Sequence, residues 1–179
     1  GAEAVVLDGR LDEVAWAQAD SIDNLTQTEP LEGGRPSGRT TVRVLVHPRF
    51  LVIGLVAANG TAPVTSFAKG RDADLGDEDH IRIVIDPFGD GRSGYLCAIN
   101  PKGARFDALV TNQGEGQNSD WDAVWEAATA VTDSGWSAEI RIPVKSLSFP
   151  AGVDRWLFNV QRRIQAALET DRWAAATRD

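Results

Sequence analysis

The sequence contains one cysteine, no methionine and two histidines. Cys97 has no partner for an internal disulfide, and its alternation with Tyr95 and Ile99 predicts a small buried side chain. Two histidines are too few for a histidine-rich metal site, and the lack of methionine argues further against haem ligation. We therefore expect no structural disulfide, zinc centre or haem.

Long hydrophobic runs and an excess of basic residues are also missing. The longest apolar run, at residues 50–58, has the length of a strand and falls well short of the ~20 residues of a membrane-spanning helix. Lys and Arg number 18 against 26 Asp and Glu, which gives a net charge of −8. Nucleic-acid binding depends on basic side chains that neutralise phosphates. We therefore expect no nucleic-acid partner and no direct membrane insertion of this domain.

Signatures of common catalytic sites are absent. The sequence has no Gly-x-Ser-x-Gly elbow, no phosphate-binding loop and no zinc motif. Carboxylate pairs are expected in so acidic a chain and do not by themselves identify a glycosidase. We expect a protein that binds rather than catalyses.

The length of 179 residues, with 42% hydrophobic and 25% charged residues, fits one globular domain over residues 1–179. The sequence begins at Gly1 without an initiating methionine and ends at Asp179, shortly after a predicted strand around Trp173. We expect this domain to be excised from a longer chain.

Short segments with a period of two, separated by turn residues, dominate the pattern. In the clearest segment, Trp136, Ala138 and Ile140 alternate with Ser137 and Glu139. Strands are predicted at residues 5–7, 40–46, 50–57, 80–86, 95–100, 105–111, 124–131, 136–142 and 156–164, with a last strand around Trp173. About nine or ten strands favour an all-β fold, an antiparallel two-sheet β-sandwich of jelly-roll-like form.

Few segments have helical periodicity. Asp12 is predicted to cap a short N-terminal helix at residues 13–18 that buries Val14 or Trp16, and a further helical turn is predicted at residues 144–147.

Two long loops, at residues 59–79 and 112–120, are where binding residues are expected. The side chains predicted to be buried between the sheets are Trp136, Ile140, Ile142, Val84 and Val44.

Several motifs together resemble family-nine carbohydrate-binding modules and their relatives. Residues 7–16 (LDGRLDEVAW) resemble the family's opening, residues 79–87 (DHIRIVIDP) its Asp-Pro strand, and residues 135–143 (GWSAEIRIP) its Gly-Trp strand. Residues 119–125 (SDWDAVW) and the Arg162-Arg163 pair further resemble the N-terminal domain of large bacterial outer-membrane proteins with a predicted β-barrel. The resemblance implies the sandwich fold and, by inheritance, sugar binding.

In the sugar binders of this family, two tryptophans hold the sugar, and Trp173 matches the second of them on the last strand. The first falls within residues 71–79, which contain no aromatic residue; Phe67 is the nearest upstream. Polar groups expected beside Trp173 are Arg71, Asn100, Gln161 and Arg162. Trp121 is a further candidate for ligand contact, with core packing as the alternative.

Acidic residues crowd into one loop, and oxygen-rich irregular segments of this kind bind hard cations such as calcium. The residues are Asp72, Asp74, Asp77 and Asp79, with Glu78 among them. Their spacing does not match an EF-hand, and a solvated acidic loop is the alternative reading. Because family-nine modules contain calcium, the resemblance makes calcium the cofactor to test.

These observations predict a non-catalytic carbohydrate-binding domain of an extracytoplasmic bacterial protein, in the periplasm, at the outer membrane or on the cell surface. Its expected ligand is an oligo- or polysaccharide. The alternative is a structural, plug or docking domain attached to an outer-membrane β-barrel in the same full-length chain, without sugar binding.

Overall fold

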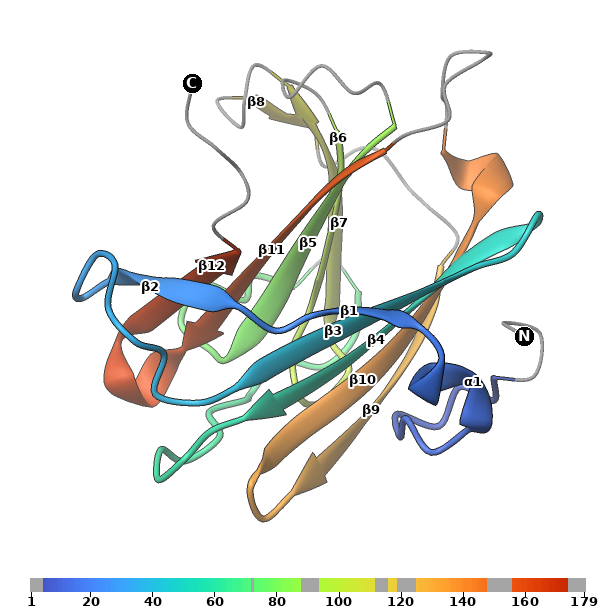
Figure 1. Cartoon of the computed structure of the whole chain (residues 1–179). Helices are drawn as coiled ribbons and strands as arrows, with labels where there is room; N and C mark the ends of the chain where they lie inside the picture. The colour runs from blue at the N-terminus through green and yellow to red at the C-terminus, as the bar shows by residue number, and fades with distance from the viewer. Residues whose placement is uncertain are drawn as a thin grey trace.

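A computed structural model describes residues 5–71, 73–87, 94–111, 116–118, 125–147 and 156–173. Two antiparallel sheets face each other (Figure 1). The five-stranded sheet has the order β1 (Asp20–Ile22), β3 (Thr40–Val46), β4 (Phe50–Ala58), β10 (Gly135–Pro143) and β9 (Glu126–Thr132). The seven-stranded sheet has the order β2 (Leu25–Glu29), β12 (Glu169–Trp173), β11 (Leu157–Ile164), β5 (His80–Asp86), β6 (Gly94–Ile99), β7 (Arg105–Thr111) and β8 (Gly116–Asn118). The predicted β-sandwich is confirmed.

Most predicted strands are present within a residue or two of the expected bounds, but three strands at sheet edges were not predicted. Residues 5–7 form no strand, so that prediction is wrong. Strands β1, β2 and β8, which sequence patterning did not reveal, lie at the edges of the two sheets, and β8 falls within the loop predicted at residues 112–120. An edge strand has one neighbour and tolerates polar residues on both faces, and β2 reads Leu-Thr-Gln-Thr-Glu. Its alternation is therefore too weak to detect.

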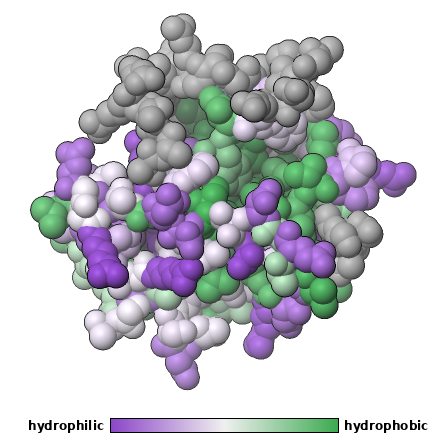
Figure 2. Space-filling view, in the orientation of Figure 1, coloured by the Kyte–Doolittle hydropathy of each residue, from purple (hydrophilic) through white to green (hydrophobic). Residues whose placement is uncertain are grey.

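The core lies between the sheets, and Trp136, Ile140 and Ile142 are buried there as predicted. Val44 packs against this core while remaining partly exposed. Val84 was predicted to be buried between the sheets, and this is wrong, because it lies on the outer face of β5 with Leu96 and Ala108. In Figure 2, hydrophobic residues gather in the hollow near the centre of the view, and hydrophilic residues lie to its left and below it.

The outer face of the five-stranded sheet is covered by the N-terminal segment and helix α1 (Val14–Ala17). Trp16 is buried against Val52, and a Cβ on Gly54 would come within 2.9 Å of the Trp16 ring, so only glycine lets the helix approach so closely. The predicted Asp12 cap is wrong: the helix begins after Glu13, without a side-chain cap. Val14 is exposed, and Trp16 is the buried residue of the pair.

Two short 3₁₀ helices complete the described secondary structure, η3 (Val144–Ser146) and η4 (Gln165–Ala167). The first agrees with the helical turn predicted at residues 144–147. No helix in the described ranges combines the length and the hydropathy required to cross a bilayer.

Candidate functional site

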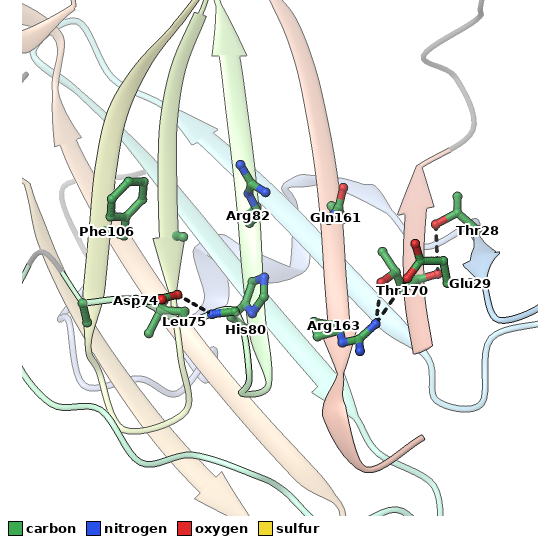
Figure 3. A pocket seen from close by; sticks show the side chains of 13 residues that line it. Thr28, Glu29, Asp74, Leu75, His80, Arg82, Phe106, Gln161, Arg163 and Thr170 are labelled. Atoms are coloured by element: carbon green, nitrogen blue, oxygen red, sulfur yellow. Dashed lines mark hydrogen bonds and ion pairs between the residues drawn. The ribbon is translucent and has the colours of Figure 1, made fainter. Parts of the chain in front are cut away.

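The outer face of the seven-stranded sheet carries a groove with a volume of about 590 Å³ (Figure 3). Strands β2, β12 and β11 supply one polar flank, and β6, β7 and the loop before β5 supply a more apolar one. The lining residues are Thr28, Glu29, Ala73, Asp74, Leu75, Gly76, His80, Arg82, Ala98, Phe106, Gln161, Arg163 and Thr170. The groove therefore offers hydrogen-bonding groups beside an apolar surface.

Strand register brings residues distant in sequence into one row across the groove. Arg82 on β5 is the cross-strand partner of Gln161 on β11 and, on its other side, of Ala98 on β6. Ala98 in turn is the partner of Phe106 on β7. Directly opposed side chains on one sheet face lie roughly 5 Å apart at Cβ, so this row is a continuous surface. The small side chain of Ala98 leaves space beside the Arg82 guanidinium.

A second row, two residues along the strands, pairs Arg163 with His80. Arg163 is held in place from one side: its Nη1 donates to Thr170 Oγ1 at 3.0 Å and lies 3.5 Å from Glu29 Oε2. Its Nε donates to Gln165 Oε1 at 3.0 Å. This arginine is thus partly neutralised by an acid on the polar flank.

His80 is buried at the floor of the groove, and its Nδ1 donates to the main-chain oxygen of Glu78 at 3.0 Å. Burial lowers the pKa of His80 below its usual value, and the positive charges of Arg82 and Arg163 lower it further. The ring is therefore neutral near pH 7, with Nδ1 protonated.

Arg82 differs from Arg163 in having no charged partner. Within the described ranges, its guanidinium makes no hydrogen bond and no ion pair, and Figure 3 shows it lying free on the sheet. The side chain is nevertheless partly buried, and this burial lowers the pKa of Arg82 with no acid opposing the shift. Arg82 is a partly desolvated cation with its donors available to a ligand.

The loop between β4 and β5 forms the apolar wall of the groove. Leu75 is buried against Ala98 and Ala104, and Phe106 packs beside this cluster. The buried side chain of Glu78 stabilises this loop, because its Oε1 accepts a hydrogen bond from Phe67 N at 2.6 Å. The long loop expected to carry binding residues therefore contributes to the groove as a fixed wall.

Among the six predicted ligand-binding residues, Gln161 lines the groove, and Trp121 lies outside the described residues. Asn100 is fully buried and has four hydrogen bonds in place: its Nδ2 donates to Ala68 O and Glu78 Oε1, and its Oδ1 accepts from Lys102 N and Ala104 N. A saturated amide has no donor left for a sugar. Asn100 shapes the turn between β6 and β7.

Arg162 is fully buried between the sheets, because it neighbours the outward Gln161 and successive strand residues point to opposite faces. Its Nη2 donates to Asn59 Oδ1 at 2.7 Å and its Nη1 to Thr40 Oγ1 at 3.0 Å. The attraction of Asp171, Asp79 and Glu169 partly offsets the lowering of its pKa by burial. The structure gives Arg162 an interior role rather than the ligand contact expected from the sequence.

Trp173 and Arg71 also lie away from the groove. Trp173 is partly buried against the core between the sheets, opposite Leu25 on β2. It therefore packs toward the core and does not line the groove. Arg71 is exposed, and its Nη2 lies 3.9 Å from Oδ1 of the buried Asp107.

The acidic loop does not gather its described carboxylates into a single group. Asp79 is buried, accepting from Asn59 Nδ2 at 3.1 Å and from Gln165 N at 2.8 Å. Asp74 and Asp77 are exposed, and Asp72 lies outside the described residues. Calcium at this loop stays a prediction, and melting temperatures measured with chelator and with millimolar calcium test it.

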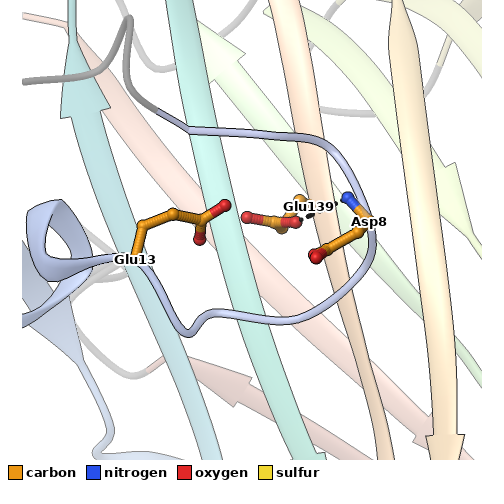
Figure 4. Close-up of side chains that lie close together, drawn as sticks. All are labelled: Asp8, Glu13 and Glu139. Atoms are coloured by element: carbon orange, nitrogen blue, oxygen red, sulfur yellow. Dashed lines mark hydrogen bonds between the residues drawn. The ribbon is translucent and has the colours of Figure 1, made fainter.

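A different set of carboxylates meets on the other sheet, where Asp8, Glu13 and Glu139 each bring an oxygen within 4.8 Å of the others (Figure 4). Glu139 Oε1 accepts from Asp8 N and Gly9 N at 3.0 Å, and Glu139 Oε2 accepts from Trp16 Nε1 at 2.9 Å. Both oxygens of Glu139 are thus occupied by N–H donors. The cluster anchors the N-terminal segment to β10.

Burial raises the pKa of Glu139 to about 7, although the hydrogen bond from Trp16 and the backbone bond at Asp8 favour its ionised form. Neighbouring residues on β10 hold the same segment: Ser137 Oγ donates to Gly9 O, and Arg141 Nη2 donates to Val5 O at 2.8 Å. The polar side chains on the outward face of β10 therefore bind the N-terminal segment to the sheet.

Sequence reasoning missed Arg82, His80, Arg163 and Phe106. The signal was present for Arg82, which sits between Ile81 and Ile83 in a clean alternation and must face away from the core. What the sequence did not show is the pairing of β5 with β11, which places Arg82 beside Gln161.

Comparison with known proteins identifies the fold. No family model and no curated protein matches the sequence. Among solved structures, a family-nine carbohydrate-binding module from Caldicellulosiruptor kristjanssonii in complex with cellotriose aligns with a TM-score of 0.68 at 12% identity, covering 94% of this chain and 79% of that one. The two chains share a fold.

Further solved structures agree. The same kind of module in complex with glucose gives a TM-score of 0.66 at 12% identity, covering 94% of this chain and 81% of the other. A candidate carbohydrate-binding protein from Bacteroides uniformis gives 0.65 at 13% identity, covering 88% and 78%.

Proposed function

We propose that this chain is a non-catalytic carbohydrate-binding domain whose ligand lies in the groove on the outer face of the seven-stranded sheet. The observation that carries the proposal is the groove itself, in which Gln161 and Arg82 adjoin the apolar surface of Ala98 and Phe106. A pyranose presents both hydroxyl groups and an apolar C–H face, so it matches a site of this mixed character.

The likeness to modules crystallised with cellotriose and with glucose supports this proposal, because it shows that the same sandwich accommodates saccharides in other proteins. At 12% identity the site must be argued from this chain's own residues. The uncovered sheet face supplies that argument: the opposite outer face is filled by the N-terminal segment and α1.

The aromatic contact in this proposal is Phe106, which lines the groove, in place of Trp173, which packs against the core. An oligo- or polysaccharide is the proposed partner, and an extracytoplasmic location follows as part of the same proposal. Because the described residues that line the groove include no tryptophan, we expect polar contacts to contribute more to binding than stacking does.

Glycan-array screening followed by calorimetry with the best saccharide tests the function. Gln161→Ala and Phe106→Ala should each weaken binding by about 5- to 13-fold, which corresponds to the loss of a hydrogen bond or a ring contact of about 1–1.5 kcal/mol. Gln18→Ala is the matched control, since Gln18 is exposed at the end of α1 on the other sheet. Failure of the parent to bind any saccharide would end the proposal.

A further inference from the structure

The charged side chains of the groove are unevenly paired. Its lining contains two arginines, Arg82 and Arg163, two acids, Glu29 and Asp74, and the neutral His80. Glu29 lies against Arg163, and Asp74 Oδ1 accepts from Gly76 N at 3.0 Å on an exposed rim. The positive charge that remains without a partner is concentrated at Arg82.

An arginine that loses part of its hydration without gaining a partner is unfavourable in the free protein. Arg82 is in this situation, because its neighbours in the row are the neutral Gln161 and the small Ala98. By contrast, Arg162, one residue along from Gln161, has its guanidinium bound by Thr40 and Asn59. A ligand group of negative charge would supply what Arg82 lacks.

The shape of the site narrows the choice of anion. The guanidinium is a planar fork whose paired N–H groups match the two oxygens of a carboxylate. Ala98 leaves room on one side of this fork, and Gln161 offers a neutral donor and acceptor on the other, suited to a hydroxyl group next to the carboxylate.

We propose that the groove selects acidic saccharides, with Arg82 binding the carboxylate of a hexuronate residue and Gln161 a neighbouring hydroxyl group. This inference rests on the proposed function, since it names the class of sugar for the same groove. A sulfate ester carries the same charge on a tetrahedral group, and the experiment separates the two.

The test compares three sets of probes by calorimetry on the full chain: uronate trisaccharides, the same trisaccharides reduced at the carboxyl group, and sulfated oligosaccharides of equal length. The parent should bind a uronate at least tenfold more tightly than its reduced counterpart. Arg82→Gln, which keeps hydrogen-bonding groups but removes the charge, should weaken uronate binding by about 10- to 100-fold. It should weaken binding of the reduced, neutral trisaccharides by a smaller factor, because these lack the carboxylate that Arg82 binds.

Arg49→Gln is the matched control, because Arg49 is exposed in the turn between β3 and β4 of the five-stranded sheet and does not line the groove. It should leave uronate affinity within about twofold of the parent at physiological salt, where exposed charges are screened. Equal losses in both variants would show a general charge effect and overturn the assignment to Arg82.

The outcomes also distinguish the proposed selection of acidic saccharides from the proposed carbohydrate binding on which it rests. Tighter binding of neutral than of acidic trisaccharides would overturn the inference and leave carbohydrate binding in place. Preference for sulfated over carboxylated probes would overturn the choice of carboxylate. Binding to no saccharide at all would overturn both. Circular dichroism and melting curves for Arg82→Gln exclude a folding defect as the cause of any loss.

Discussion

Arg162 and Arg82 lie on neighbouring strands of one sheet, and their surroundings are opposite. Arg162 faces inward, is fully buried, and donates hydrogen bonds to Thr40 and Asn59 with three acidic side chains nearby. Arg82 faces outward into a groove and has no charged or hydrogen-bonded partner among the described residues. Arg162 therefore has its partners within the fold, whereas in our proposal the partner of Arg82 is the carboxylate of a ligand.

The comparison shows that residue type alone says little about function in a β-sandwich. Each arginine follows an alternating pattern, and the face it occupies decides whether its charge is used within the fold or presented to a ligand. Four substitutions test this contrast.

Arg162→Ala should have the largest effect. It leaves Asp79, Glu169 and Asp171 inside the sandwich without their counter-charge, and breaking a buried ion network costs about 3–5 kcal/mol. Urea unfolding measures the loss. If the variant were as stable as the parent, the interior role assigned to Arg162 would be incorrect.

Trp173→Ala should cost about 2 kcal/mol, roughly half the value for a fully buried tryptophan, because its ring packs against the core but remains partly exposed. Saccharide binding should change little. A stable variant that no longer binds saccharide would restore Trp173 as the sugar platform expected from the sequence.

Asp171→Asn should have a smaller, pH-dependent effect. Burial, followed by the charge of Glu169, raises the pKa of Asp171 from 3.8 to about 7. The folded state therefore holds a proton that the unfolded chain releases, and this stabilisation is present below pH 3.8 and lost as the pH rises through about 7.

The asparagine variant lacks this titration, so its melting temperature relative to the parent should rise between pH 4 and pH 8. Glu169→Gln is a useful companion, because removing that charge should lower the pKa of Asp171 and shift the transition to lower pH. A difference between parent and Asp171→Asn that stays constant with pH would contradict the raised pKa.

Arg82→Ala should have the smallest effect on stability, within about 0.5 kcal/mol of the parent, since no hydrogen bond or ion pair with a described residue is lost. The most direct test of the comparison is to measure the loss in free energy of unfolding for Arg82→Ala and Arg162→Ala in the same denaturation series. A loss comparable to that of Arg162→Ala would show that Arg82 supports the fold.

The fold was largely predictable, because period-two segments such as Trp136–Ile142 and the motif at residues 79–87 point directly to strands of a known sandwich. The site was predicted less well. Gln161 and Arg162 were both expected to contact the ligand, but adjacent residues of one strand cannot share a face. Asn100 and Asp79 are turn- and loop-forming residues whose hydrogen bonds are already made inside the protein.

By itself, the sequence determined most of the central strands and the burial of residues such as Trp136 and Ile140, because alternation is a local property of the chain. Only the tertiary structure decided which outer face stays open. The N-terminal segment folds onto the sheet that carries Gly54 and Glu139, and this leaves Arg82, Gln161 and Phe106 uncovered. Such a choice depends on contacts between residues more than one hundred positions apart, which no local pattern records.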